Sequence, residues 1–135
     1  EFVRYGVMHK NTYMNSPQLL DNKFNLRSDK RFYFAGQMTG VEGYVESAAS
    51  GLMAGLHAAR AALELEAVEF PSETAHGALA NYISNPSVKE FQPMNVNFGL
   101  IPPLTQRIRK KREKNAMIAA RALEHLDEIK AKYQI

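Results

Sequence analysis

Three glycines constrain this sequence most, because they lie between an apolar run and the start of a long helical pattern. The apolar run covers residues 32–35, and Gly36, Gly40 and Gly43 follow it. Glycine adopts positive φ without steric cost and lets a ligand approach the backbone closely. The helix that follows presents N–H groups without intrahelical partners and the positive end of its dipole. The pattern predicts a strand, a tight loop and a helix start that suits an anionic or carbonyl-rich ligand, as at the carboxyl edge of an α/β sheet.

The spacing of these glycines does not by itself identify the ligand. It matches neither the Gly-x-Gly-x-x-Gly dinucleotide loop nor the Walker loop, and an ordinary tight turn would use the same residues. The helix after the loop has an apolar stripe in alternating steps of four and three from Val45 to Leu63. It also contains Gly51 and Gly55, and each is unfavourable in mid-helix by roughly 1 kcal/mol relative to alanine. We expect these two glycines to allow close packing against a sheet or a cofactor.

The rest of the chain predicts further helices and little sheet. Residues 2–9 have the composition of a strand. A helix is expected over residues 73–83, with Ser72 as its N-cap. Four prolines between residues 86 and 103 predict an irregular segment, and the apolar period beyond it predicts a helix over residues 104–133. The expected fold class of the chain is α+β, mostly helical with a few short strands.

Composition excludes several classes of site. The chain has 135 residues and no cysteine, so a disulfide scaffold, a thiolate zinc site and a cysteine nucleophile are excluded within it. No apolar run approaches the ~18 residues of a membrane span, and we expect no membrane partner. His57, His76 and His125 lack metal-ligand spacing, so they are expected to be structural and no metal site is expected.

Positive charge is concentrated near the end of the sequence. Residues 104–135 carry nine basic and four acidic side chains, although the net charge of the whole chain is only +3. Six of the nine basic side chains fall within residues 107–114. Such a block is either the solvated face of a helix or a surface that follows a phosphate backbone.

Three segments resemble one family in family order. Residues 34–52 (FAGQMTGVEGYVESAASGL) are similar to the second flavin-binding segment of the folate- and FAD-dependent tRNA (uracil-5-)-methyltransferases, the TrmFO family, formerly called Gid. Residues 4–13 (RYGVMHKNTY) and residues 91–104 (FQPMNVNFGLIPPL) resemble two further blocks of that family. The nearest alternative is the GidA or MnmG family, which acts on the wobble uridine of tRNA. The loop ending in Gly43-Tyr44-Val45-Glu46-Ser47 and the Asn97-Phe98-Gly99 block favour the methyltransferase.

The resemblance implies a bacterial, cytoplasmic enzyme with an α/β, Rossmann-like FAD-binding fold. Such an enzyme forms 5-methyluridine in the T-loop of tRNA with carbon from 5,10-methylenetetrahydrofolate, and its FAD is reduced by NADH or NADPH. The family's dinucleotide loop and catalytic cysteines lie upstream of the segments seen here. We therefore expect a C-terminal piece that is inactive alone: residues 1–66 would complete the FAD-binding domain and residues 67–135 would form a helical extension.

The resemblance also assigns residues to the flavin. The expected cofactor contacts are the loop, the helix start and one asparagine: Gly36, Gln37, Met38, Thr39, Gly40, Val41, Glu42, Gly43, Tyr44 and Asn97. Gln37 stands where related flavoproteins place an aspartate that contacts the ribityl chain, and an amide can both donate and accept there. Tyr44 is the aromatic residue best placed to lie over the isoalloxazine or to stack against a substrate ring; a core tyrosine at a helix start is the alternative.

Contacts to tRNA are expected at two places. Arg4 and Lys10 are candidate phosphate contacts near the end of the first strand, and Arg107, Lys110 and Lys111 are the candidates in the basic block. No catalytic residue is expected in this chain, but His9, which could transfer a proton near neutral pH, and Tyr44 are candidates for assisting catalysis. A plain surface loop is the alternative for residues 9–12. A second hypothesis for the whole chain is a non-enzymatic RNA-binding module, and self-association through surfaces left exposed is expected of a separated piece.

Overall fold

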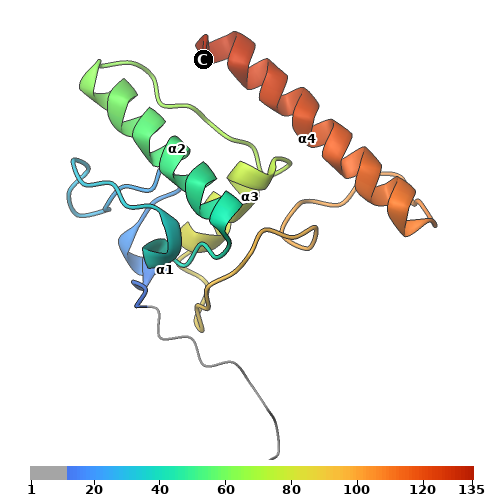
Figure 1. The fold of residues 1–135 in the computed structure, drawn as a ribbon, viewed down its shortest axis with the longest axis horizontal. Helices are drawn as coiled ribbons and strands as arrows, with labels where there is room; N and C mark the ends of the chain where they lie inside the picture. The colour runs from blue at the N-terminus through green and yellow to red at the C-terminus, as the bar shows by residue number, and fades with distance from the viewer. Residues whose placement is uncertain (1–11) are drawn as a thin grey trace, which may run out of the picture.

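The computed structural model describes residues 12–135, which form one 3-10 turn and helices of very different length (Figure 1). The elements in chain order are α1 (Ser16–Leu19), η1 (Gly36–Thr39), α2 (Tyr44–Ala62), α3 (Ala75–Ser84) and α4 (Lys111–Tyr133). The mostly helical character is therefore confirmed. None of the helices in this part of the chain is long and apolar enough to cross a membrane.

The expected short strands are absent from residues 12–135. Residues 32–35 have the sequence of a strand, but only Tyr33 pairs, in an isolated antiparallel bridge with Asn25. Two more isolated bridges join Leu20 to Leu26 and Val41 to Met94. A strand requires a neighbouring backbone along its length, and the described residues offer one pairing position here. The strand expected over residues 2–9 lies outside the described part.

The start of α3 differs from the prediction. Thr74, rather than Ser72, is the N-cap, and its hydroxyl oxygen accepts a hydrogen bond of 3.0 Å from the N–H of Gly77. Ser72 instead donates its hydroxyl proton to the carboxylate of Glu73. The helix ends at Ser84, close to the predicted end. Both hydroxyl residues suit an N-cap, so only the three-dimensional contact distinguishes them.

The last helix begins seven residues later than predicted. Lys111 is the first residue of α4, and residues 104–110 are irregular. The apolar stripe behind the prediction runs from Ala119 to Tyr133 and does not constrain the residues before it. Arg121 of α4 donates hydrogen bonds to the carbonyl oxygens of Pro102 and Pro103, the two residues that precede this segment.

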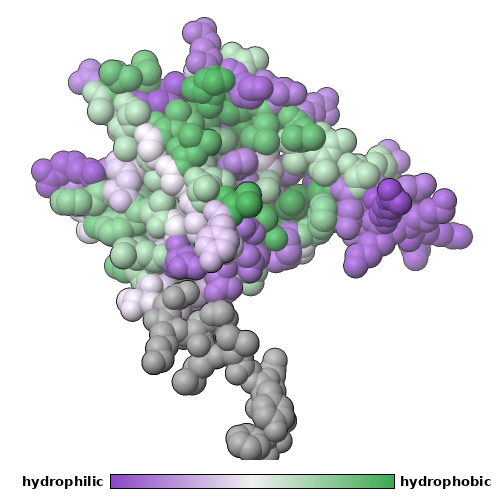
Figure 2. Space-filling view, viewed as in Figure 1, coloured by the Kyte–Doolittle hydropathy of each residue, from purple (hydrophilic) through white to green (hydrophobic). Residues whose placement is uncertain are grey.

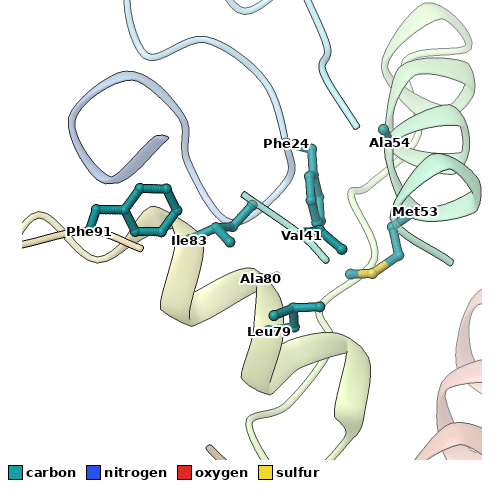
Figure 3. Close-up of a cluster of buried hydrophobic side chains, with 8 residues drawn as sticks. All are labelled: Phe24, Val41, Met53, Ala54, Leu79, Ala80, Ile83 and Phe91. Atoms are coloured by element: carbon teal, nitrogen blue, oxygen red, sulfur yellow. The ribbon is translucent and has the colours of Figure 1, made fainter. Parts of the chain in front are cut away.

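The main core lies between α2, α3 and the loops that precede and follow them (Figure 3). Phe24 and Val41 come from loops, Met53 from α2, Ile83 from α3 and Phe91 from the segment after α3. All of them are less than 10% exposed, and burial of a side chain of this size contributes roughly 1.5–3 kcal/mol. This core positions the glycine loop, because Val41 belongs to both.

A second cluster attaches α4 to the chain that follows α2. Val68 packs against Ile129 and Tyr133, and the N–H of Glu69 donates to the hydroxyl of Tyr133. Arg60 of α2 donates to the carbonyl oxygen of Tyr133 at 3.3 Å and lies over its ring. The C-terminal end of α4 is thus fixed by residues 60–69, and the basic N-terminal end extends away from α1 (Figure 1).

Acidification should destabilise this fold through two histidines. Burial lowers the pKa of His57, with Lys23 as a further cause, and burial lowers the pKa of His76, both from the ordinary 6.5. The folded state therefore keeps neutral imidazoles, while the unfolded chain takes up protons as the pH falls through 6.5. Stability is complete above that pH and is lost as the pH falls toward the lowered folded-state pKa values, by at most about 1.4 kcal/mol per pH unit for each histidine.

Urea unfolding at a series of pH values from neutral to mildly acidic measures this loss. His57 is 3% exposed and its Nδ1 has no hydrogen-bond partner, so His57→Met removes the titration without leaving a buried polar group unpaired. This variant should flatten the pH dependence of the unfolding free energy. An unchanged pH dependence in the variant contradicts the assignment.

Candidate functional site

The glycine loop has the backbone conformation that its sequence predicts. Gly36, Gly40 and Gly43 have φ values of +71°, +82° and +88°, in the left-handed region that favours glycine. Gly36 begins η1, Gly40 ends it, and Gly43 is the N-cap of α2. The chain therefore turns at each glycine between residues 35 and 44.

The packing of the chain itself requires Gly40, whereas Gly43 is required by its positive φ, because an added Cβ there would meet only the ends of two side chains that can move. A Cβ atom on Gly40 would overlap the ring of Phe91. A Cβ atom on Gly43 would overlap the carboxylate of Glu46 and approach Asn95 Nδ2 to 2.7 Å. At Gly36 the nearest atom to an added Cβ is Ser47 Cβ at 3.7 Å, an ordinary contact.

Hydroxyl groups of α2 hold the loop in place. The N–H of Gly36 donates to Ser50 Oγ at 2.8 Å, and the hydroxyl of Ser50 donates to the carbonyl oxygen of Ser47 at 2.8 Å. Thr39 Oγ1 donates to the carbonyl oxygen of Gly36 at 2.8 Å and closes η1 on itself. These hydrogen bonds therefore fix the loop to the first two turns of α2 independently of any ligand.

The segment after α3 supports the other side of the loop. The N–H of Glu42 donates to the carbonyl oxygen of Met94 at 3.0 Å, and the N–H of Met94 donates to the carbonyl oxygen of Gly40 at 2.9 Å. Asn95 Nδ2 donates to Glu46 Oε1 at 3.4 Å. Glu42 was among the expected cofactor contacts, and Met94 and Asn95 belong to the block of residues 91–104 that resembles the family, but the sequence did not predict that they support the loop.

The start of α2 offers hydrogen-bond donors without a side-chain cap. Gly43 has no side chain, and no side-chain cap bond is made at this end of the helix. The N–H groups of the first turn and the positive end of the dipole can therefore receive a carbonyl oxygen or an anion. Glu46 is the acidic residue of the first turn, and its carboxylate favours the dipole but opposes an added negative charge beside it.

The residues expected to contact a cofactor divide into exposed and buried groups. Gln37, Met38 and Tyr44 are exposed, and Tyr44 is 94% exposed. Thr39 and Val41 have no exposed surface, so their side chains pack inside the protein and only their backbone could meet a ligand. The alternative interpretation of Tyr44 as a core residue is wrong for residues 12–135.

Asn97 lies on a different surface. Its Nδ2 donates to the carbonyl oxygen of Asn95 at 3.2 Å and its Oδ1 accepts from the N–H of Gly99 at 2.9 Å, so its amide closes a local turn. It also lines an apolar groove of about 530 Å³ beside α4. A second groove of about 460 Å³ runs along the first turns of α2 and shares Val96 and His76 with it. The structure thus places Asn97 on the α4 side.

The basic candidates form an exposed end of the molecule. Arg107 precedes the helix, Lys110 is its N-cap and Lys111 is its first residue, so the block is only partly helical. All three side chains are exposed, and Figure 2 shows hydrophilic residues gathered at this end of α4. Lys110 Nζ lies 3.6 Å from Glu113 Oε1, an exposed ion pair. Arg4, His9 and Lys10 lie outside the described residues.

The three histidines do not form a metal site. Within residues 12–135 no group of three or more His, Asp or Glu side chains is arranged to hold a metal ion. His57 lies edge-on to Phe70 at 6.1 Å and His76 stacks on the same ring at 5.6 Å, centroid to centroid. His125 lies on α4 with its Nδ1 3.0 Å from Glu128 Oε2. These contacts agree with structural roles.

Comparison with known proteins gives two kinds of match. The family described as "Glucose inhibited division protein A" matches residues 1–66. The methylenetetrahydrofolate–tRNA-(uracil-5-)-methyltransferase TrmFO of Lactiplantibacillus plantarum is 58% identical over 130 residues, which are 96% of this chain and 30% of that protein. The proteins of the same name from Listeria monocytogenes and Desulforamulus reducens are 57% and 59% identical over 129 and 128 residues.

The chain is related to the TrmFO family. The resemblance found in the three sequence segments is thereby confirmed, and the relatives cover the residues after 66 as well as those before. The chain spans about 30% of the length of the TrmFO proteins that it matches.

Gly36 and Gly40, which have similar positive φ values, provide a matched test of the loop. Gly36→Ala should cost about 1–2 kcal/mol of unfolding free energy, the cost of a left-handed φ for an L-residue. Gly40→Ala should cost a further 1–3 kcal/mol or so, because its methyl group also displaces the Phe91 ring. Urea unfolding of both variants of the 135-residue chain measures the difference. Equal losses would show that Gly40 does not pack on Phe91.

Proposed function

We propose that this chain is a flavin-binding portion of a bacterial, cytoplasmic enzyme that forms 5-methyluridine in the T-loop of tRNA. In such an enzyme the one-carbon unit comes from 5,10-methylenetetrahydrofolate, and FAD reduced by NADH or NADPH supplies the electrons. The observation that carries the proposal is an identity of 55–60% to TrmFO proteins along nearly the whole chain. No cysteine is present in the sequence, so the nucleophile would belong to the part of the relatives that this chain does not span.

The glycine loop and the start of α2 fit the polar edge of a flavin. Reduced flavin carries negative charge at its pyrimidine edge, and uncapped N–H groups at a helix N-terminus stabilise such charge by about 0.3–1 kcal/mol, or more when partly buried. The hydrogen bonds from Gly36 to Ser50 and from Met94 to Gly40 fix the loop in advance. A binding site that is fixed before the ligand arrives loses less conformational entropy on binding.

Two exposed side chains complete the proposed contact. Gln37 presents an amide that can donate to and accept from the hydroxyl groups of the ribityl chain. Tyr44, at the first position of α2, presents an aromatic ring beside the uncapped N–H groups, where it can stack on the isoalloxazine. These side chains would orient the cofactor and shield one face of it from water.

The basic segment of residues 107–114 is the proposed tRNA contact. Its exposed cations can neutralise phosphates without reading bases, and the relatives' printed name includes tRNA as the methyl acceptor. A GidA- or MnmG-type enzyme remains the second candidate for the parent activity, since the matched family over residues 1–66 carries that description. The relatives of residues 67–135 favour the methyltransferase.

Replacement of Tyr44 tests the flavin contact. The protein to use is a full-length chimera, in which this chain replaces the corresponding 130-residue region of the L. plantarum TrmFO. Tyr44→Ala should weaken FAD binding by about fivefold or more, because a lost aromatic stack is worth about 1 kcal/mol. Tyr44→Phe keeps the ring and should keep the affinity. Flavin fluorescence titration measures both, and equal affinity in the Ala and Phe variants would refute the stacking role.

Charge removal tests the tRNA contact. Replacing Arg107, Lys110 and Lys111 by alanine in the chimera should weaken tRNA binding and lower the slope of log K against log salt by about 2–3. The control replaces Lys30, Lys89 and Lys130 by alanine and removes the same charge from other surfaces. Filter binding at several salt concentrations measures the slopes. If both triple variants lose affinity equally, the basic segment is not the contact and only net charge matters.

A further inference from the structure

The carboxylate of Glu46 lies over the start of α2. Glu46 is the third residue of this helix, and Gly43 is its N-cap. A Cβ atom added to Gly43 would overlap the carboxylate, and Glu46 Cδ lies 2.7 Å from the position of that added atom. The side chain therefore folds back toward the N-terminus of the helix. Its negative charge lies beside N–H groups that have no side-chain cap.

A residue far away in the sequence holds this carboxylate in place. Asn95 Nδ2 donates to Glu46 Oε1 at 3.4 Å, across 49 positions of the chain. The preceding residue, Met94, is joined to the glycine loop by two backbone hydrogen bonds, of 2.9 Å to Gly40 and 3.0 Å from Glu42. Because Asn95 is anchored through this neighbour, its amide keeps the Glu46 side chain at the helix start.

Glu46 forms no ion pair with a cation among residues 12–135. The ion pairs in this part of the chain all involve other acidic residues, such as Asp21 with Lys30 and Glu69 with Lys23. The charge of Glu46 is instead stabilised by the positive end of the helix dipole and by the amide of Asn95. A negative charge on a ligand at this helix end would therefore lie close to a second negative charge that no cation in the described residues neutralises.

We propose that Glu46 sets the balance between oxidised and reduced flavin, with Asn95 as its positioning residue. The inference rests on the proposed function, because it takes the start of α2 as the site of the pyrimidine edge. That edge is uncharged in oxidised FAD and negative in reduced FAD, so the carboxylate opposes binding of the reduced form more than binding of the oxidised form. Two like charges close together at a protein surface change such a balance by about tenfold. The reduced cofactor is then a stronger electron donor, which suits the electron supply in the proposed function.

Removal of the charge on Glu46 in the full-length chimera tests this proposal. Glu46→Gln keeps the length of the side chain and an oxygen that can accept from Asn95. It should strengthen binding of reduced FAD relative to oxidised FAD by about tenfold, which raises the midpoint potential of the two-electron couple by about 30 mV. Equilibration with a redox dye, followed by absorbance, measures this potential. The matched control is Glu64→Gln, which removes the same charge just beyond the other end of α2 and should leave the potential unchanged.

Replacement of Asn95 separates a role in positioning from a purely structural role. Asn95→Ala releases the carboxylate from the helix start and should raise the potential by a smaller amount, and it should add nothing to Glu46→Gln, because the two residues act as a unit. A purely structural role would weaken binding of oxidised and reduced FAD alike and leave the potential unchanged. An unchanged potential in Glu46→Gln, or in Asn95→Ala if the first variant does not fold, would overturn the proposal, as would an equal rise in Glu64→Gln. Titration of the unmodified chimera with oxidised FAD reports on the proposed function separately.

Discussion

The contact between Gly40 and the ring of Phe91 is the interaction on which the candidate site depends. It brings the segment after α3 against the loop before α2, and the paired hydrogen bonds between Met94 and the loop backbone follow from it. Because the loop turns here with a left-handed φ, Val41 enters the core while the first turn of α2 remains at the surface. This one turn thus determines both the packing of the core and the exposure of the first turn of α2.

Features with a local cause could be predicted from the sequence. The left-handed glycines and the end of α3 each depend on residues close to one another in the chain. The stripe predicted for α2 was wrong as a core face, because Val45, Leu52 and Leu63 are exposed while Met53, Ala54 and His57 are buried. Features that depend on distant partners could not. Residues 32–35 have the composition of a strand but form a single bridge, because the rest of residues 12–135 offers only one pairing position. Phe24 enters the core with a φ of +66°, and nothing in the sequence around this phenylalanine predicts that conformation.

In the candidate site, too, some features could be predicted from the sequence and others could not. Tyr44 and Gln37 were identified by resemblance and are exposed beside the uncapped helix start. Thr39 and Val41 belonged to the same motif but lie in the core, because a motif records which residues recur together and not which way each side chain points. Ser50 and Met94 lie outside the loop itself, and only their hydrogen bonds to it reveal that they support it.

The central claim is that the uncapped start of α2 receives the flavin. Hydrogen–deuterium exchange of the full-length chimera with and without FAD tests it most directly, because the N–H groups of Tyr44, Val45 and Glu46 belong to the first helical turn, where intrahelical partners are lacking. The account predicts that added FAD slows exchange in the peptide that contains these three residues. Unchanged exchange there, in a protein that demonstrably holds FAD, would contradict it.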